Sequence, residues 1–259
     1  MTNRPLLTSL TAGAALALAA ATPAQAQSAA KPAAEPTVAA PVAAADPLVT
    51  AFALLETGSI ADAIEQLYGI KTYMSHQMRP VQQEKMAGRA VTVFFKKEEN
   101  KDGSAAIGGM INVLDTAPAG SVFVLGMEDG LDYGAIGGMM TTTMKSRGLA
   151  GAISGGGLRD LGQIRKLGFP VWGASIVPST TVGHYRFAGS NIPVSVGGVT
   201  VNAGDIIVAD ADGIVVVPAD KAAAILPKAQ ENDFVEHATL PYIEKYKSLK
   251  KAVDTFGRI

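Results

Sequence analysis

Residues 121–160 read SVFVLGMEDG LDYGAIGGMM TTTMKSRGLA GAISGGGLRD and alternate short apolar runs with glycine-rich segments. Ser121–Met127 is a continuous apolar run, which is typical of a strand buried on both faces. After it, the pattern predicts a helix at 137–147, a second buried strand at 149–153 and a second helix at 158–167. This order of strand and helix, repeated, favours an α/β domain.

The flanking segments extend this pattern in both directions. Leu48–Leu67 has apolar residues at helical spacing and predicts two short helices that Gly58 separates, with Ser59 as the N-cap of the second. Asp212-Gly213 predicts a hairpin turn with positive φ at both residues. Further strands are predicted at 90–95, 170–177, 194–196, 199–201, 206–210 and 214–217, and further helices at 105–114 and from 222 to about 250. We therefore expect a single α/β domain whose second half is mostly sheet.

The composition excludes several classes of protein. The chain of 259 residues has no cysteine, which excludes a disulfide scaffold, a thiolate metal site and a catalytic cysteine. Its 22 Lys and Arg residues against 23 Asp and Glu residues argue against nucleic-acid binding, because no excess positive charge would neutralise phosphates. The three histidines, His76, His184 and His237, are far apart in the sequence and do not favour a zinc site.

The first 47 residues are expected to lie outside the domain. Residues 1–26 combine an early arginine, a mostly apolar run and a final Ala-Gln-Ala, the pattern of a signal peptide cleaved after Ala26. A transmembrane anchor is the alternative, and the alanine-rich, interrupted run disfavours it. Residues 27–47 are rich in Ala and Pro and predict an extended linker. We expect a periplasmic or secreted protein with no membrane segment after cleavage and a domain at 48–259.

Two glycine-rich elements each lie between a predicted strand and a predicted helix. They are GAIGGMM at 134–140 and SGGGLRD at 154–160. Glycines at such a junction let the backbone approach a ligand, and the free N–H groups of the helix start favour an anion. For the first element, a tight turn with close helix–sheet packing explains the spacing equally well.

Charged residues next to these elements are candidates for chemistry. Arg159 and Asp160 form either an exposed ion pair or, as the three preceding glycines favour, a ligand site in which Arg clamps a carboxylate and Asp binds a hard cation. Asp129 follows the first buried strand, where α/β proteins collect functional residues, and a turn-capping role is its alternative. Four other carboxylates are interpreted as turn residues: Asp115, Asp205, Asp210 and Asp212.

These motifs resemble a known family. Together with KSRGLAG at 145–151, LGFPV at 167–171 and matching residues within 193–218, they are similar to the regulators of ribonuclease E activity and the class II 4-hydroxy-4-methyl-2-oxoglutarate / 4-carboxy-4-hydroxy-2-oxoadipate aldolases. The resemblance implies a swivelling β/β/α domain of the type found in both groups. It also implies assembly as a homotrimer or homohexamer with sites between subunits.

The same resemblance implies a site and a reaction. Backbone N–H groups of Gly137, Gly138, Met139 and Met140 would bind a pyruvyl carboxylate. Arg159 would contact the substrate, Asp160 would hold Mg²⁺ or Mn²⁺ largely through waters, and Asp129 would lie near the reacting centre.

The implied reaction is retro-aldol cleavage of a 2-oxo acid, or oxaloacetate decarboxylation, with release of pyruvate. The sequence departs from the family pattern at Gly155, where the family usually has an aspartate. A non-catalytic binding or regulatory protein on the same scaffold is therefore the alternative.

Overall fold

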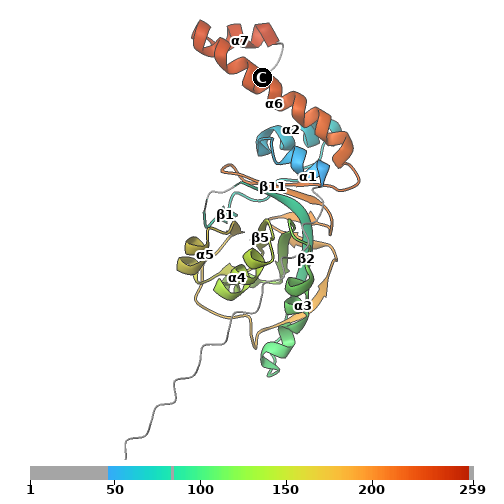
Figure 1. Ribbon diagram of the computed structural model, residues 1–259, viewed down its shortest axis with the longest axis vertical. Coiled ribbons are helices and arrows are strands. Elements are labelled where there is room, and N and C mark those ends of the chain that lie inside the picture. The colour runs from blue at the N-terminus through green and yellow to red at the C-terminus, as the bar shows by residue number, and fades with distance from the viewer. Residues whose placement is uncertain (1–45, 83–84, 257–259) are drawn as a thin grey trace, which may run out of the picture. The chain divides into compact units, whose positions relative to one another are not determined.

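The computed structural model of the protein describes residues 46–82 and 85–256 (Figure 1). The predicted signal peptide and most of the predicted linker lie outside these residues. The first helix, α1 (Pro47–Phe52), begins one residue before the predicted domain boundary. The Asp46 carboxylate accepts hydrogen bonds from the backbone N–H of Leu48 and Val49, and it pairs with Arg89 at 2.8 Å. The last two residues of the predicted linker therefore belong to the folded domain.

The main sheet has the order β1-β7-β5-β3-β2-β11-β12, with β8 paired to β2. Strands β2, β3, β5 and β7 are parallel, whereas β1, β8, β11 and β12 join by antiparallel pairing. The bounds are β1 Arg79–Pro80, β2 Met86–Lys97, β3 Val122–Met127, β5 Gly151–Ser154, β7 Val171–Gly173, β8 Tyr185–Ser190, β11 Ile206–Ala209 and β12 Ile214–Val217. Every residue of β3 and of β5 is buried, as the apolar runs predict.

Strand β2 is longer than predicted and pairs with three strands. Its first four residues, 86–89, pair with β11, residues 90–95 pair with β3, and residues 93–97 pair with β8. The sequence did not predict β8, because that strand is only partly buried and its apolar residues do not alternate clearly. Two small sheets complete the strands: β4 (Gly134–Ile136) with β6 (Gly157–Leu158), and β9 (Val194–Val196) with β10 (Val199–Val201).

Seven helices and two 3-10 turns are present among the described residues. After α1, their bounds are α2 Thr57–Tyr68, η1 Gly103–Ile107, α3 Gly108–Thr116, η2 Gly130–Asp132, α4 Gly138–Ser146, α5 Leu161–Leu167, α6 Ala222–Tyr246 and α7 Leu249–Phe256. None of them is long and apolar enough to cross a membrane.

Two local predictions about turns and caps are wrong. Helix α2 begins at Thr57, so Gly58 and Ser59 lie inside its first turn and Ser59 is not the N-cap. The carboxylate of Asp210 instead accepts from the backbone N–H and the hydroxyl of Thr57, at 2.8 and 2.7 Å. The predicted β11–β12 hairpin is present, but neither Asp212 nor Gly213 has a positive φ. Asp210 instead closes that turn by accepting from the backbone N–H of Asp212.

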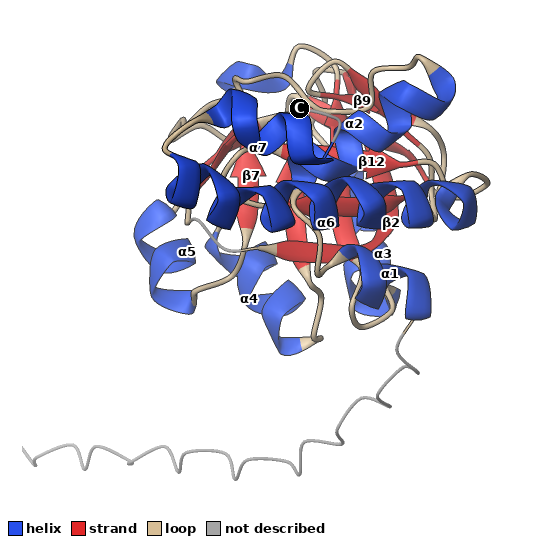
Figure 2. Cartoon of the chain, turned by 90° about the horizontal axis from the view of Figure 1, so that it is seen from above, coloured by secondary structure: helices blue, strands red, loops and turns tan. Residues whose placement is uncertain are grey.

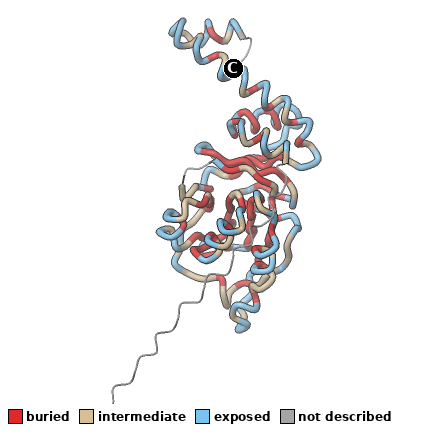
Figure 3. The backbone as a smooth tube through the Cα atoms, viewed as in Figure 1, coloured by how far each residue is buried: buried red, intermediate tan, exposed pale blue. Residues whose placement is uncertain are grey.

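The core consists of three clusters of buried residues. Figure 2 shows the helices and strands that carry them, and Figure 3 shows buried residues in red. Phe123 and Leu125 of β3 face Met110 of α3, Met144 of α4 and Ile164 of α5. On the opposite face, Val122 and Val124 pack against residues of β9 to β12. The far side of β11 and β12 is covered by α1, α2 and α6. This arrangement is the single α/β domain that the sequence predicts.

Candidate functional site

The two glycine-rich elements are joined by backbone hydrogen bonds. Strands β4 and β6 are parallel neighbours, Gly157 N–H donates to the carbonyl of Tyr133 at 2.8 Å, and Arg159 N–H donates to that of Ile136 at 3.0 Å. Leu158 is therefore a strand residue, and the predicted helix at 158–167 begins only at Leu161. Two segments that are separate in the sequence thus lie side by side in one small sheet.

Glycine is required at the start of α4 because charged side chains pack directly against it. A Cβ atom on Gly137 would lie 2.7 Å from Oδ2 of Asp160 and 3.0 Å from Cγ of Arg159. At Gly134 it would lie 2.5 Å from the carbonyl oxygen of Ser179. The spacing therefore agrees with the close-packing interpretation of the first element, and the anion-site interpretation stays a prediction.

Asp160 connects the two elements through its side chain. It has a left-handed backbone conformation, with φ of 57°. Its Oδ2 accepts a hydrogen bond from Gly138 N–H at 3.0 Å and lies 3.8 Å from Nε of Arg159. The side chain is about half exposed. The Gly138 N–H is thus already hydrogen-bonded to Asp160 in this structure, whereas the sequence predicted that it binds an anionic substrate.

Arg159 is held by a loop that the sequence did not identify. Its Nη1 donates to the carbonyl of Ser179 at 3.2 Å. The hydroxyl of Ser179 donates to the carbonyl of Asp132 at 2.6 Å and accepts from Gly134 N–H at 3.2 Å. The run of three hydroxyl residues at 179–181, following a predicted strand, is the only sequence signal for this loop.

A cavity of about 370 Å³ opens beside Arg159 and Asp160. The apolar side chains of η1 and α3 form part of its wall, and its charged lining residues are Arg159, Asp160 and Asp115. Asp115 lies in the last turn of α3, so its interpretation as a turn carboxylate is wrong. The lining residues are Ser104, Ile107, Met110, Ile111, Leu114, Asp115, Gly134, Ala135, Gly137, Met139, Met140, Thr143, Arg159, Asp160 and Thr180 to Val182.

Of the predicted site residues, only Asp129 and Gly138 do not line this cavity. Gly138 lines an adjoining recess with Met139, Thr142, Asp160 and Gln163. Asp129 is exposed just after β3 and has a left-handed backbone conformation, with φ of 41°. Its side chain makes no capping hydrogen bond to η2, the turn that follows.

The hydroxyl of Tyr185 fixes the turn that carries Asp129. It donates to the carbonyls of Glu128 and Asp129, at 2.7 and 3.0 Å. Burial, together with the nearby Tyr133 and Asp129, raises the pKa of Tyr185 to about 12. The hydroxyl therefore remains a proton donor at any physiological pH.

The donor groups at the site suit a metal that keeps most of its waters. No group of three or more His, Cys, Asp and Glu residues converges among the described residues. Asp160 offers Oδ1, which accepts no hydrogen bond within the described chain, on a half-exposed side chain. Mg²⁺ is commonly held by one or two carboxylates and several waters, so Asp160 fits such an ion and does not fit a dehydrated one.

Known proteins match most of this chain. A family model described as Aldolase/RraA matches residues 57–216. The "Putative 4-hydroxy-4-methyl-2-oxoglutarate aldolase" of Halalkalibacterium halodurans is 28% identical over 193 residues, which are 73% of this chain and 85% of that protein. Protein DlpA of Legionella pneumophila is 28% identical over 172 residues, which are 66% of this chain but only 28% of DlpA.

A solved structure gives the same fold. RraAS2 of Streptomyces coelicolor, described as an unusual member of the RNase ES inhibitor RraA protein family, matches with a TM-score of 0.66 and 28% identity, over 75% of this chain and 96% of that chain. This confirms the swivelling β/β/α class that the sequence motifs imply. Because the family model covers more than half of the chain, the protein belongs to the Aldolase/RraA family.

Proposed function

We propose that this protein is a divalent-metal-dependent lyase that releases pyruvate from a 2-oxo acid. The observation that carries the proposal is the cavity in which Arg159 and Asp160 lie against the start of α4. Relatives named as aldolases support the reaction class. The proposed substrates are of the 4-hydroxy-4-methyl-2-oxoglutarate or 4-carboxy-4-hydroxy-2-oxoadipate type, with oxaloacetate as a substrate for decarboxylation.

The cavity offers complementary groups to a small 2-oxo acid. The guanidinium of Arg159 has donors beyond the one bonded to Ser179, and a planar fork of this kind suits a carboxylate. The N–H groups of Met139 and Met140 lie at the positive end of the α4 dipole. Met110 and Leu114 of α3 would contact the carbon chain of the substrate.

Asp160 would hold Mg²⁺ or Mn²⁺, with waters completing the coordination. When bound, the metal supplies polarisation of the 2-keto oxygen, which stabilises the enolate of pyruvate. Gly138 N–H and the guanidinium of Arg159 orient the carboxylate of Asp160 for this role.

The carbon–carbon cleavage needs one proton acceptor and one proton donor. The C4 hydroxyl of the substrate loses its proton as the C3–C4 bond breaks, the electron pair passes to the pyruvate enolate, and C3 then takes up a proton. We propose Asp129 for this exchange, acting directly or through a water, a role that typically contributes roughly 10²–10⁴ in rate. Asp115 is the competing carboxylate because it lines the cavity itself.

The test is release of pyruvate from oxaloacetate and from 4-hydroxy-4-methyl-2-oxoglutarate, followed with lactate dehydrogenase, with Mg²⁺ or Mn²⁺ and with EDTA. Arg159→Ala and Asp160→Ala should abolish the metal-dependent activity. Arg165→Ala on α5 and Asp220→Asn, which line no part of the cavity, are matched controls and should retain it. Comparing Asp129→Asn with Asp115→Asn identifies the proton-transfer residue. Inactivity of the metal-loaded wild type on both substrates would contradict the proposal.

The second candidate is a non-catalytic binding or regulatory protein on the same scaffold. The observation in its favour is Gly155, where the family pattern has an aspartate. A Cβ atom there would lie 2.9 Å from the carbonyl oxygen of Leu125, so this backbone leaves no space for the missing carboxylate. If the wild type is inactive but a 2-oxo acid still raises its melting temperature, this candidate is favoured.

Assembly and export also belong to the proposal. Met139 is 87% exposed and Ile111 42% exposed at the rim of the cavity, and apolar side chains exposed in this way are typical of a subunit contact. We propose a homotrimer or homohexamer, which light scattering after gel filtration would measure. We also propose export of the chain, and an unprocessed N-terminus of the native protein in mass spectrometry would contradict it.

A further inference from the structure

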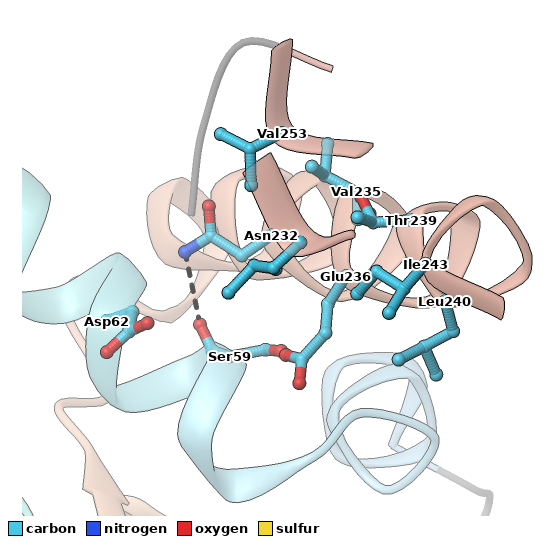
Figure 4. A pocket seen from close by; sticks show the side chains of 10 residues that line it. Ser59, Asp62, Asn232, Val235, Glu236, Thr239, Leu240, Ile243 and Val253 are labelled. Atoms are coloured by element: carbon cyan, nitrogen blue, oxygen red, sulfur yellow. Dashed lines mark hydrogen bonds between the residues drawn. The ribbon is translucent and has the colours of Figure 1, made fainter. Parts of the chain in front are cut away.

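A separate cavity of about 330 Å³ lies between α2, α6 and α7 (Figure 4). It shares no residue with the cavity beside Arg159 and Asp160. Both α6 and α7 lie beyond residues 57–216, which match the family model. Its volume is within the range of small-molecule sites, roughly 300–1,000 Å³.

Most of the wall is apolar. Val235, Leu240 and Ile243 come from α6, and Leu249 and Val253 come from α7. Leu240 and Leu249 are each about half exposed, so the cavity leaves hydrophobic surface in contact with solvent. A ligand with a short hydrocarbon body would remove this surface from water.

The lining of the cavity carries two acidic side chains that form no ion pair within the described part of the chain. Asp62 of α2 and Glu236 of α6 line it, and the lining contains no basic side chain. Figure 4 shows the side chain of Glu236 extending from α6 toward α2.

Ser59 supplies an independent sign of a missing ligand. This residue is 3% exposed and lines the cavity, and its hydroxyl oxygen has no hydrogen-bond partner within the part of the chain that the structure describes. The nearby Asn232 donates to the backbone carbonyl of Ser59, at 3.3 Å, and to Oε1 of Gln66, at 3.4 Å. Buried side-chain polar atoms in native proteins are nearly always hydrogen-bonded, so a group bound in the cavity would account for this one.

We propose that this cavity binds a primary alkylammonium ligand. An ammonium group carries three donors and no acceptor, and the lining of the cavity includes three acceptor side chains, those of Ser59, Asp62 and Glu236. The hydrocarbon body lies against Val235 and Val253. A carboxylate ligand is disfavoured by the two like charges, and a neutral apolar ligand would leave the hydroxyl of Ser59 unpaired.

The test is isothermal titration of the 259-residue protein with hexylammonium, hexan-1-ol and hexanoate, which share one hydrocarbon chain and differ in the polar group. We expect hexylammonium to bind about fivefold more tightly than hexan-1-ol, the upper end of what one exposed ion pair supplies, and hexanoate to give no saturable heat. Glu236→Gln should reduce the affinity for hexylammonium to near that for hexan-1-ol. Glu244→Gln, on the same helix but outside the cavity, is the matched control and should change nothing.

A second variant tests whether the ligand binds in this cavity. Val253→Trp fills the space from α7 and should abolish binding of both hexylammonium and hexan-1-ol, with folding checked by circular dichroism. Equal affinity for the amine and the alcohol would overturn the proposal, as would the absence of saturable hexylammonium binding. Retained binding in folded Val253→Trp would overturn it too. None of these results depends on lyase activity.

Discussion

At the scale of single residues, two residues that lie outside the cavity shape the candidate site. Tyr185 is fully buried and its hydroxyl joins two consecutive carbonyls of the turn that carries Asp129. Gly155 allows the strand end of β5 to lie against β3, where its N–H donates to the carbonyl of Leu125 at 2.7 Å. Both residues act through packing and hydrogen bonding of the backbone.

Tyr185→Phe should lower the free energy of unfolding by about 1–3 kcal/mol, because the carbonyls of Glu128 and Asp129 lose their buried donor. Urea denaturation measures the change. Tyr73→Phe, at a half-exposed position, is the control and should stay within about 0.5 kcal/mol of the wild type. A Tyr185→Phe protein as stable as the wild type would show that the hydroxyl does not hold the turn.

The stability of the wild type should also fall at high pH. The pKa of Tyr185 is raised from 10 to about 12 in the folded state, so its contribution is complete below pH 10 and is lost as the pH rises from 10 through 12. In Tyr185→Phe this part of the decline should be missing. Parallel urea titrations at several pH values between 8 and 11 would reveal the difference, and identical pH profiles would refute the assignment.

Gly155→Asp should destabilise the protein and should not restore a family-like site. The new Cβ would lie 2.9 Å from the carbonyl oxygen of Leu125, and overpacking of this kind typically costs about 1–3 kcal/mol. Gly162→Ala in α5 is the control, because no atom lies within 4 Å of its added Cβ, and it should be neutral or stabilising. Thermal unfolding distinguishes the two variants.

At the scale of elements, the start of α2 is fixed by a distant hairpin. Asp210 lies 153 residues from Thr57 in the sequence and accepts two hydrogen bonds from it. Asp210→Ala should therefore cost about 2 kcal/mol of unfolding free energy, the upper range for a lost helix cap, because it also removes the bond from Asp212. Asp212→Ala is the matched control, since its own side chain caps nothing in the described structure, and an equal effect of both variants would contradict this assignment.

The elements also show what sequence patterns reveal. Apolar runs predicted β3, β5, β11 and β12 because these strands are buried throughout and Ser154, at the end of β5, is their one polar residue. The glycines and the Arg159-Asp160 pair predicted which charged residues lie beside the glycine-rich elements. Glycine spacing and charge are both features of one short stretch of sequence. Asp115, Ser179 and the cap from Asp210 could not be predicted, because each depends on contacts between segments that are distant in the sequence.

At the scale of the whole molecule, α7 is a helix added after the domain that the family shares. It packs mainly on α6 and lies outside the residues that match the family model. A chain that ends at Ser248 should keep its fold and its pyruvate release while it loses hexylammonium binding, because Leu249 and Val253 form part of that cavity. Loss of both activities together would show that the two sites are coupled.

Strand β2 and helix α2 both form hydrogen bonds with segments near the end of the chain. Residues 86–89 pair with β11, and Thr57 is capped by Asp210. During synthesis, the N-terminal helices therefore remain without their core until the β11–β12 hairpin has left the ribosome. Pulsed hydrogen exchange of stalled nascent chains should find α1 and α2 unprotected until almost the entire protein has been made.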